Sequence, residues 1–452
     1  MLGVSNRVKV NEPLGTPYGC AVYCQNGGHV CPCRRPPAQA RPRVPPTRVS
    51  ERFDLAIVGG GIIGLATAYR LLAARPDLRL TVLEQEPEVA MHQSGHNSGV
   101  VHAGLYYAPG SLKAQLCREG KTALEAFCAA KEIPVERVGK LVIALNEAEL
   151  PRLDALRERA TANGVPGLEV VDGERIRELE PHAAGVRALW SPTTGIVDFR
   201  RVALAYAAEV RARGGTIRTG ARVTAIDTRA DGLVLHTENE ELAAGAAVVC
   251  AGLWADRVAE LTGDGGRDAP RIVPFRGDYY TLTPDARPLV RGLIYPLADP
   301  RFPFLGVHFT RRIDGEVWAG PNAVLAFARA GYRRRDLSAR DLTTTLAFPG
   351  FARLAARYLR TGLAEMWRDL SKRAFLAELQ RYVPELRAEQ LTFGPSGVRA
   401  QALARDGTLV DDFDLAGRGR VLHVRNAPSP GATASLAIGR VLSERAVAQF
   451  GL

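Results

Sequence analysis

The sequence predicts an α/β chain of two interleaved domains, a Rossmann-type dinucleotide-binding domain and a domain built on an antiparallel sheet. Residues 54–84, DLAIVGGGIIGLATAYRLLAARPDLRLTVLE, have the order strand, glycine turn, helix and strand that is typical of a dinucleotide-binding unit. Residues 270–325 differ in character, because aromatic and apolar residues alternate there with polar ones, as in antiparallel strands. A strand, a turn and a long helix at the C-terminal end are what the first domain needs to close.

The stretch 54–84 predicts a buried strand at 55–58, a helix that ends near residue 74 and a second strand at 80–83. The helix N-terminus offers free N–H groups and the positive end of the helix dipole to phosphates. Glu84 ends the unit, where its carboxylate can accept hydrogen bonds from an adenosine ribose. This acid argues against the 2′-phosphate of NADP, whereas the unit alone leaves FAD and NAD open.

Three glycines of the turn have separate tasks. Gly59 permits the tight turn out of the strand, Gly61 lets the backbone approach a pyrophosphate, and Gly64 lets helix and strand pack without a Cβ between them. The residues expected to hold the cofactor in this unit are Gly59, Gly61, Ile62, Gly64, Glu84 and Gln85.

The chain after this unit continues with a loop at 91–107, MHQSGHNSGVVHAGLYY, whose small side chains suit close passage along a flavin. A strand at 242–250 then ends before Ala251 and Gly252, which again leave room for a cofactor. The other expected elements are helices at 111–131, 151–163 and within 195–213, and strands at 140–145, 216–218 and 221–227. Residues 333–390 are expected to be mostly helical, with Leu342, Leu346, Leu354, Leu376 and Leu379 facing inward.

The charge of the chain is uneven. Of the net charge of +11, residues 1–52 contribute +6, from eight Lys and Arg residues and two acids. This Pro- and Arg-rich segment lacks hydrophobic periodicity and an apolar signal-peptide region, so 1–50 is predicted to be a disordered tail. It resembles a mitochondrial transit peptide in composition, although its prolines oppose an amphipathic helix, and sequence upstream of the true start is an equal alternative. No nucleic-acid motif accompanies the charge, and no apolar run is long enough to span a membrane.

The cysteines divide between the tail and the body of the chain. Cys20, Cys24, Cys31 and Cys33 have a spacing that matches no established zinc pattern, so no metal is expected. Cys117, Cys128 and Cys250 lie in apolar stretches and are predicted to be buried thiols of a reducing compartment.

The turn before the last helix, NAPSPGAT at 426–433, suits the stabilisation of negative charge on a reduced flavin. Its prolines stiffen the turn, and the N–H groups of Gly431, Ala432 and Thr433 are expected to point at the flavin C2 carbonyl. The alternative is an ordinary Pro/Gly helix start.

A hydroxy-acid substrate would need a cationic clamp and a base. Arg276 and Arg399 could together bind a dicarboxylate, and each could instead form a structural salt bridge. His102 and His308 are the candidate bases, since histidine titrates near neutrality, although a single strand histidine is more often structural. Two further candidates for hydrogen bonds to the substrate are Tyr279 and Asn322.

Seven long motifs resemble one family, the L-2-hydroxyglutarate dehydrogenases/oxidases of the D-amino-acid-oxidase-like superfamily. The resemblance covers the chain from about Arg52 to its end and leaves 1–50 outside. The motifs are HQSGHNSGVVHAGLYYAPGSLKAQLC (92–117), GIVDFRRVAL (195–204), RIVPFRGDYY (271–280), PRFPFLGVHFT (300–310), GPNAVLAF (320–327), GVRAQAL (397–403) and HVRNAPSPGATASLAI (423–438).

The resemblance implies FAD and oxidation of L-2-hydroxyglutarate to 2-oxoglutarate, with electrons passed to a quinone, another carrier or oxygen. We expect the FAD to bind noncovalently, and covalent attachment through His or Cys is the alternative. It implies a cytoplasmic protein or one peripheral on the inner membrane, and a mitochondrial one in a eukaryote. It supports His102, His308, Arg276 and Arg399 without deciding which histidine is the base. The further residues expected at the flavin are Ser94, Gly95, Asn97, Ser98, Val223, Ala251, Gly252, Gly397, Pro430, Gly431, Ala432 and Thr433.

The predicted boundaries assign 52–138, 195–262 and 391–452 to the FAD-binding domain, and 139–194 and 263–390 to the substrate domain. Because a fold does not fix a substrate, an amino- or imino-acid oxidase is the nearest rival function. A flavoprotein that serves as a redox sensor without turnover is a rival of another class.

Overall fold

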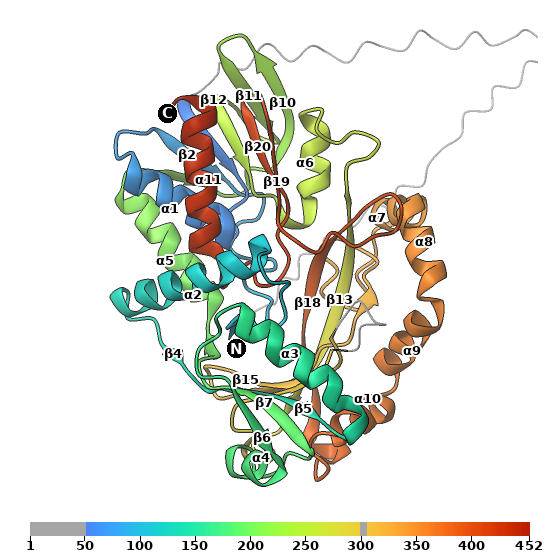
Figure 1. Ribbon diagram of the computed structural model, residues 1–452. Coiled ribbons are helices and arrows are strands. Elements are labelled where there is room, and N and C mark those ends of the chain that lie inside the picture. Colours follow the sequence, from blue (N-terminus) through green and yellow to red (C-terminus); the bar gives the residue numbers. More distant parts are fainter. Residues whose placement is uncertain (1–50, 299–304) are drawn as a thin grey trace, which may run out of the picture. The chain divides into compact units, whose positions relative to one another are not determined.

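The computed structural model describes residues 51–298 and 305–452, apart from the side chains at 360, 361, 363 and 364 (Figure 1). The predicted tail, its four cysteines and the first part of the 300–310 motif lie outside these residues. The described residues belong to one compact unit.

The first sheet of the described chain has eight strands, five of them in a parallel row. β12 pairs in parallel with β1 and with β20, and β1 continues in parallel to β2 and then to β9. β10, β11 and β19 are antiparallel additions. The strands are β1 (Arg52–Val58), β2 (Leu80–Leu83), β9 (Thr216–Arg218), β10 (Val223–Arg229), β11 (Gly232–Thr237), β12 (Glu241–Val249), β19 (Asp414–Arg418) and β20 (Val421–Asn426).

Four helices belong to the core of this sheet: α1 (Ile62–Ala74), α2 (Leu112–Ala130), α5 (Phe199–Ala212) and α11 (Ser435–Phe450). α1 packs against α5 and α11, and α11 also contacts α2 (Figure 1). The approach of α1 and α11 is close, because a Cβ on Gly439 would lie 2.9 Å from the backbone of Ala66. The C-terminal helix therefore closes the dinucleotide-type domain, as the sequence predicts.

The second sheet is mixed and has nine strands among the described residues. All of its pairs are antiparallel except β5 with β14, which confirms the antiparallel prediction for 270–325. The strands are β5 (Lys140–Ala144), β6 (Glu169–Asp172), β7 (Arg187–Ser191), β13 (Arg271–Leu282), β14 (Leu293–Pro296), β15 (His308–Arg311), β16 (Val317–Gly320), β17 (Val324–Leu325) and β18 (Leu391–Leu403). A small sheet of β3 (Val100–Val101), β8 (Gly195–Val197) and β4 (Val135–Glu136) completes the strands described.

The other α-helices of the described residues are α3 (Leu150–Ala162), α4 (Gly173–Leu179), α6 (Ala255–Leu261), α7 (Ala339–Leu346), α8 (Pro349–Arg357), α9 (Leu359–Leu370) and α10 (Lys372–Gln380). The sequence did not predict α4. Leu354, Leu376 and Leu379 are buried as expected. Leu346 is 56% exposed, so its predicted inward position is wrong, since α7 buries Thr345 instead. No helix in the described ranges is long and apolar enough to cross a bilayer.

Two further observations concern the predicted boundaries and thiols. β18 pairs with β13 along most of its length, which places residues 391–403 in the nine-stranded sheet. The division into two domains stays a prediction. Cys117 and Cys128 are buried free thiols as expected, whereas Cys250 is free and half-buried. Burial raises the pKa of Cys117 to about 12 and that of Cys128 to about 11, so both are protonated at neutral pH.

Candidate cofactor and substrate sites

The glycine turn between β1 and α1 has the geometry that its sequence predicts. Gly59 has a φ of +113°, and a Cβ there would lie 2.3 Å from the carbonyl oxygen of Cys250 at the end of the neighbouring strand. A Cβ on Gly64 would lie 2.1 Å from the carbonyl oxygen of Gly59. Both positions therefore exclude a side chain, and the N-terminus of α1 stays close to the sheet.

Glu84 lies at the end of β2, beside this turn. One carboxylate oxygen accepts the N–H of Gly60 at 2.6 Å, and the other accepts that of Glu86 at 2.9 Å. Burial raises the pKa of Glu84, and the two backbone donors oppose that shift. Each carboxylate oxygen retains acceptor capacity, so the side chain can hold the turn and still accept a hydrogen bond from a ribose hydroxyl.

A cavity of about 440 Å³ opens next to this turn, within the usual size range of ligand sites. It is bordered by the end of β1, the end of β2, the loop after it, the start of β10 and the turn after β12. The predicted cofactor residues that line it are Gly59, Gly61, Glu84, Gln85, Ser94, Val223, Ala251 and Gly252. Its shape and donors fit the adenosine and pyrophosphate part of a dinucleotide.

Among the residues expected in the 91–107 loop, several hold the loop itself. The Ser94 hydroxyl accepts the N–H of Ile62 at 2.9 Å and so caps α1 from outside the helix. Asn97 donates to the carbonyls of Gln93 and Ser94 and accepts the N–H of Gly99. A Cβ on Gly95 would lie 2.7 Å from the carbonyl oxygen of Ala90. Ser98 is half-buried in the same loop, and contact of these residues with a flavin stays a prediction.

The turn before α11 lies against the 91–107 loop. The Thr433 hydroxyl accepts the N–H of His102 at 3.2 Å, and Pro430 is buried beside it. The N–H of Gly431 donates to the carbonyl of Pro428 at 2.8 Å, so this amide already has a partner in the turn. The expected contact with a flavin carbonyl would therefore fall to the N–H groups of Ala432 and Thr433. Gly397 of β18 also approaches the loop, since a Cβ there would lie 2.8 Å from the carbonyl oxygen of His96.

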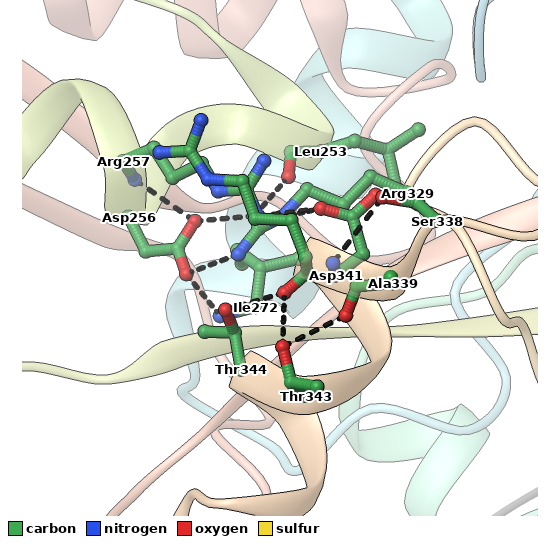
Figure 2. A network of polar contacts seen from close by, with 11 residues as sticks. Leu253, Asp256, Arg257, Ile272, Arg329, Ser338, Ala339, Asp341, Thr343 and Thr344 are labelled. Atoms are coloured by element: carbon green, nitrogen blue, oxygen red, sulfur yellow. Dashed lines mark hydrogen bonds and ion pairs between the residues drawn. The ribbon is translucent and has the colours of Figure 1, made fainter. Parts of the chain in front are cut away.

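A buried ion-pair network supports the turn after β12 (Figure 2). Arg329 binds the Asp256 carboxylate with a contact of 2.8 Å and donates to the carbonyl of Leu253, next to Gly252 of the cavity wall. Asp341 of α7 accepts the backbone N–H of Arg329 at 2.9 Å and pairs with Arg257. Arg329 and Asp256 are 4% and 6% exposed. The network thus fixes the cavity wall to β13 and α7.

The two candidate histidines belong to one cluster, in which His308 is buried and His102 is half-buried. His308 Nδ1 is 2.9 Å from the carbonyl of Gly306, and the His308 ring stacks on Tyr295 with 3.9 Å between centroids. His102 Nε2 is 3.4 Å from the hydroxyl of Ser429. Burial lowers the pKa of each histidine to about 3. The charge of Lys140 contributes to both shifts. The Tyr295 ring joins His308 to Lys140, because its centroid lies 3.9 Å from that of the His308 ring and 3.8 Å from the Lys140 ammonium.

Arg399 and Tyr279 belong to the same cluster. The charge of Arg399 acts on His308 and opposes the burial that raises the pKa of Tyr279 and of Tyr295. Arg399 lies directly opposite Phe275 in the β13–β18 pair, so these two side chains share one face of the sheet.

Arg276 and Asn322 are not brought to this cluster. Arg276 follows Phe275 in β13 and therefore points to the other face, where its Nε donates to Asp278 at 2.9 Å. A second contact of 3.5 Å joins Arg276 to Asp369 of α9. Asn322 belongs to the same group, since it accepts the N–H of Asp278 at 2.7 Å and donates to Asp369 at 2.6 Å. The charge of Arg276 is thus balanced within the protein.

Lys140 is not among the site residues predicted from the sequence, although it belongs to the cluster around His308. It is the first residue of β5 and is 1% exposed, and its ammonium lies 3.8 Å from the centroid of the Tyr295 ring. The available signal was a single lysine at the start of the otherwise apolar segment KLVIAL. Within the described ranges, no group of three or more His, Cys, Asp and Glu residues could hold a metal ion.

Comparison with known proteins agrees with this geometry. The family model described as FAD dependent oxidoreductase, DAO, matches residues 54–445. The mitochondrial L-2-hydroxyglutarate dehydrogenase of Nematostella vectensis is 50% identical over 422 residues, which are 89% of this chain and 92% of that protein. The human protein of the same name is 46% identical over 420 residues, covering 89% of this chain and 90% of its own length.

A solved structure has the same fold at low sequence identity. The L-α-glycerophosphate oxidase of Mycoplasma pneumoniae, determined with FAD bound, has a TM-score of 0.70 and 22% identity, and covers 88% of this chain and 95% of its own. The glycine turn, the acid that follows β2 and the cavity between them fit the cofactor that the family uses. The chain belongs to the family of FAD-dependent oxidoreductases.

Proposed function

We propose that this protein oxidises L-2-hydroxyglutarate to 2-oxoglutarate with FAD. The observation that carries the proposal is the 46–50% identity, over 89% of the chain, to proteins named L-2-hydroxyglutarate dehydrogenase. The site supports it independently, because a cluster of two neutral histidines and two cationic side chains suits an anionic hydroxy acid. FAD supplies an acceptor for the hydride that leaves C2 of the substrate.

The residues that would hold FAD are those around the cavity and the turn before α11. Gly59, Gly61 and the N-terminus of α1 would accept the pyrophosphate, and Glu84 the ribose. Ala432 and Thr433 would donate to the flavin ring from the start of the last helix. The tight backbone contacts at Gly59 and Gly64 keep this cradle in shape without a ligand.

The substrate hydroxyl must lose its proton as the carbonyl forms. His308 and His102 are both neutral at physiological pH, because burial depresses their pKa, and a neutral imidazole can accept a proton. Nδ1 of His308 lies at 2.9 Å from the Gly306 carbonyl, a contact that orients the ring and leaves Nε2 for the substrate. We assign the proton acceptor to His308, with His102 beside it.

Arg399 is proposed to bind one carboxylate of the substrate. It lies on the face of the β13–β18 pair that carries Tyr279, and its charge reaches His308. A guanidinium can bind a carboxylate through two parallel hydrogen bonds, which fixes the orientation of the substrate as well as its affinity. Arg276 and Asn322 would support the sheet from its other face through Asp278 and Asp369.

The experiment that tests this function is reduction of the bound flavin in the absence of air. L-2-hydroxyglutarate should bleach the flavin, whereas its D enantiomer and small amino acids should not. Bleaching by an amino acid alone would favour the amino- or imino-acid oxidase, and a flavin that none of these compounds reduces would favour a redox sensor.

The electron acceptor is proposed to be a quinone, another carrier or oxygen, and a quinone would require contact with a membrane. Leu359, Met366, Trp367 and Leu370 of α9 are 60%, 50%, 65% and 72% exposed, at spacings that place them on one side of the helix. Exposed Trp and Leu on an amphipathic helix favour a position in the bilayer interface. Peripheral binding, mitochondrial in a eukaryotic cell, is our proposal for this surface.

Flotation with liposomes tests the membrane proposal. The double substitution Trp367→Ser/Leu370→Ser should abolish flotation of the protein with liposomes that contain anionic lipid, while turnover with a soluble acceptor stays unchanged. Leu337→Ser is the matched control, because Leu337 is 67% exposed and lies outside α9. Flotation that is equal for the double variant and the control would contradict membrane contact through α9.

A further inference from the structure

The position of Lys140 differs from that of every other lysine in the described chain. Lys113, Lys121 and Lys131 each pair with a carboxylate, and Lys372 donates to the backbone carbonyl of Leu391 at 2.7 Å. Lys140 instead lies over aromatic rings, 3.8 Å from the centroid of Tyr295 and 5.0 Å from that of Tyr106. No carboxylate is among the contacts that the described residues make with its ammonium.

A buried ammonium without a counter-ion is costly. Lys140 is 1% exposed, and the rings around it compensate only part of the lost hydration. The pKa of Lys140 is accordingly lowered to about 7 by its burial. An anionic ligand placed beside the ammonium would remove this penalty, because an opposite charge favours the protonated form.

The surroundings of Lys140 point to the substrate as that anion. Lys140 and His308 contact the same ring, because the Tyr295 centroid lies 3.8 Å from the Lys140 ammonium and 3.9 Å from the centroid of the His308 ring, and the charge of Arg399 also acts on His308. His308 therefore lies within reach of two cations that come from different strands, β5 and β18. Arg276, the second cation expected from the sequence, is on the other face of its strand and is paired with Asp278.

We infer that Lys140 binds one carboxylate of a dicarboxylate substrate while Arg399 binds the other, so that the hydroxyl-bearing carbon lies next to His308. This inference rests on the proposed function and deepens it, since two cations near the histidine, one from β5 and one from β18, explain a preference for a dicarboxylate over a monocarboxylate. Lys140 is thus a residue for substrate specificity that the sequence motifs did not single out.

The test measures binding of glutarate, a dicarboxylate that lacks the reacting hydroxyl, to the flavin-loaded protein at pH 6.5 by calorimetry. Lys140→Met should weaken the binding of glutarate by at least about tenfold, which is the loss of affinity expected when a hydrogen bond to a charged group is removed. Lys140→Gln should do the same. Lys372→Met is the matched control and should bind glutarate like the wild type. KM for L-2-hydroxyglutarate should rise by a similar factor, with a smaller change in the rate of flavin reduction at saturation.

The outcomes separate this inference from the proposed function. Met in place of a buried, unpaired lysine should not unfold the protein, and flavin content and thermal unfolding check this. Glutarate affinity that is unchanged in both Lys140 variants overturns the inference and leaves the proposed function intact. Unchanged glutarate affinity together with a large loss in the rate of flavin reduction also overturns the inference, because Lys140 would then act in the transfer of the substrate's hydroxyl proton and not in carboxylate binding. Wild-type protein that binds neither glutarate nor 2-oxoglutarate would overturn both.

Discussion

At the scale of single residues, the site depends on which charges burial permits. His102 and His308 are neutral, and the charge of Arg276 is balanced by Asp278 and Asp369. The ammonium of Lys140 lies over the ring of Tyr295. A dicarboxylate would bring negative charge next to Lys140, whose contacts with the described residues include no carboxylate. The same balance gives the site a defined response to pH.

We expect kcat/KM for L-2-hydroxyglutarate to fall as pH rises above about 7. A lysine with a lowered pKa carries its charge below that pKa and loses it above, so the cation that binds the carboxylate disappears at high pH. The other groups that face Lys140 keep their charge states between pH 5 and 9, because burial lowers the pKa of both histidines and raises that of Tyr106, Tyr295 and Cys117.

The measurement is a pH profile of kcat/KM for the wild type and for Lys140→Met. As pH rises through the pKa of Lys140, kcat/KM of the wild type should fall toward that of the variant, and the variant should lack this limb. No decline should occur between pH 6.5 and 5, since neither histidine gains a proton there. If the decline of kcat/KM at high pH persisted unchanged in Lys140→Met, the decline would belong to another titrating group.

At the scale of secondary-structure elements, the cofactor cradle is fixed by contacts between segments far apart in the sequence. The turn after β12 lies next to the cavity, and Arg329 of a distant loop holds it through Leu253 and Asp256 (Figure 2). Asp256 also accepts the N–H of Ile272 at 3.1 Å, at the start of β13. The network therefore couples the first sheet to the second.

Arg329→Met should lower the free energy of unfolding by about 3–5 kcal/mol, the usual cost of leaving one partner of a buried ion pair uncompensated. Flavin should also dissociate more readily, because the turn at Gly252 loses its support. Denaturant unfolding and flavin release measure the two effects. Arg52→Met is the control, since Arg52 pairs with Asp231 at the surface and its loss should have little effect. Equal unfolding midpoints for the two variants would contradict a supporting role of the network.

At the scale of the whole molecule, the periodicities of the sequence predicted many strands of both sheets, and the helices α1, α2 and α3, to within a few residues, whereas β6, β7 and α4 were not predicted. They did so because local patterns decide these elements: β2 occupies 80–83 as expected, and α1 ends at Ala74. The need for glycine at positions 59 and 64 was equally predictable, because a side chain at either position would collide with nearby backbone.

The site was less predictable, because it depends on which face of a strand each side chain occupies and on what lies opposite. The pairing of Arg276 with Asp369 joins residues 93 positions apart, and the use of the Gly431 amide by Pro428 depends on the shape of one turn. The environment of Lys140 depends on Tyr106 and Tyr295, whose rings approach its ammonium from distant segments of the chain. Leu346 shows the same limit in the core, since apolar spacing alone did not predict that it faces solvent.

The most direct test of the central claim is an anaerobic titration of the purified, flavin-loaded protein with L-2-hydroxyglutarate and then with its D enantiomer. The L form should bleach the long-wavelength flavin band in one turnover, with one 2-oxoglutarate formed per flavin, and the D form should not. Protein that carries flavin but is bleached by neither enantiomer would contradict the proposed substrate, and protein that binds no flavin would contradict the assignment of the cofactor site.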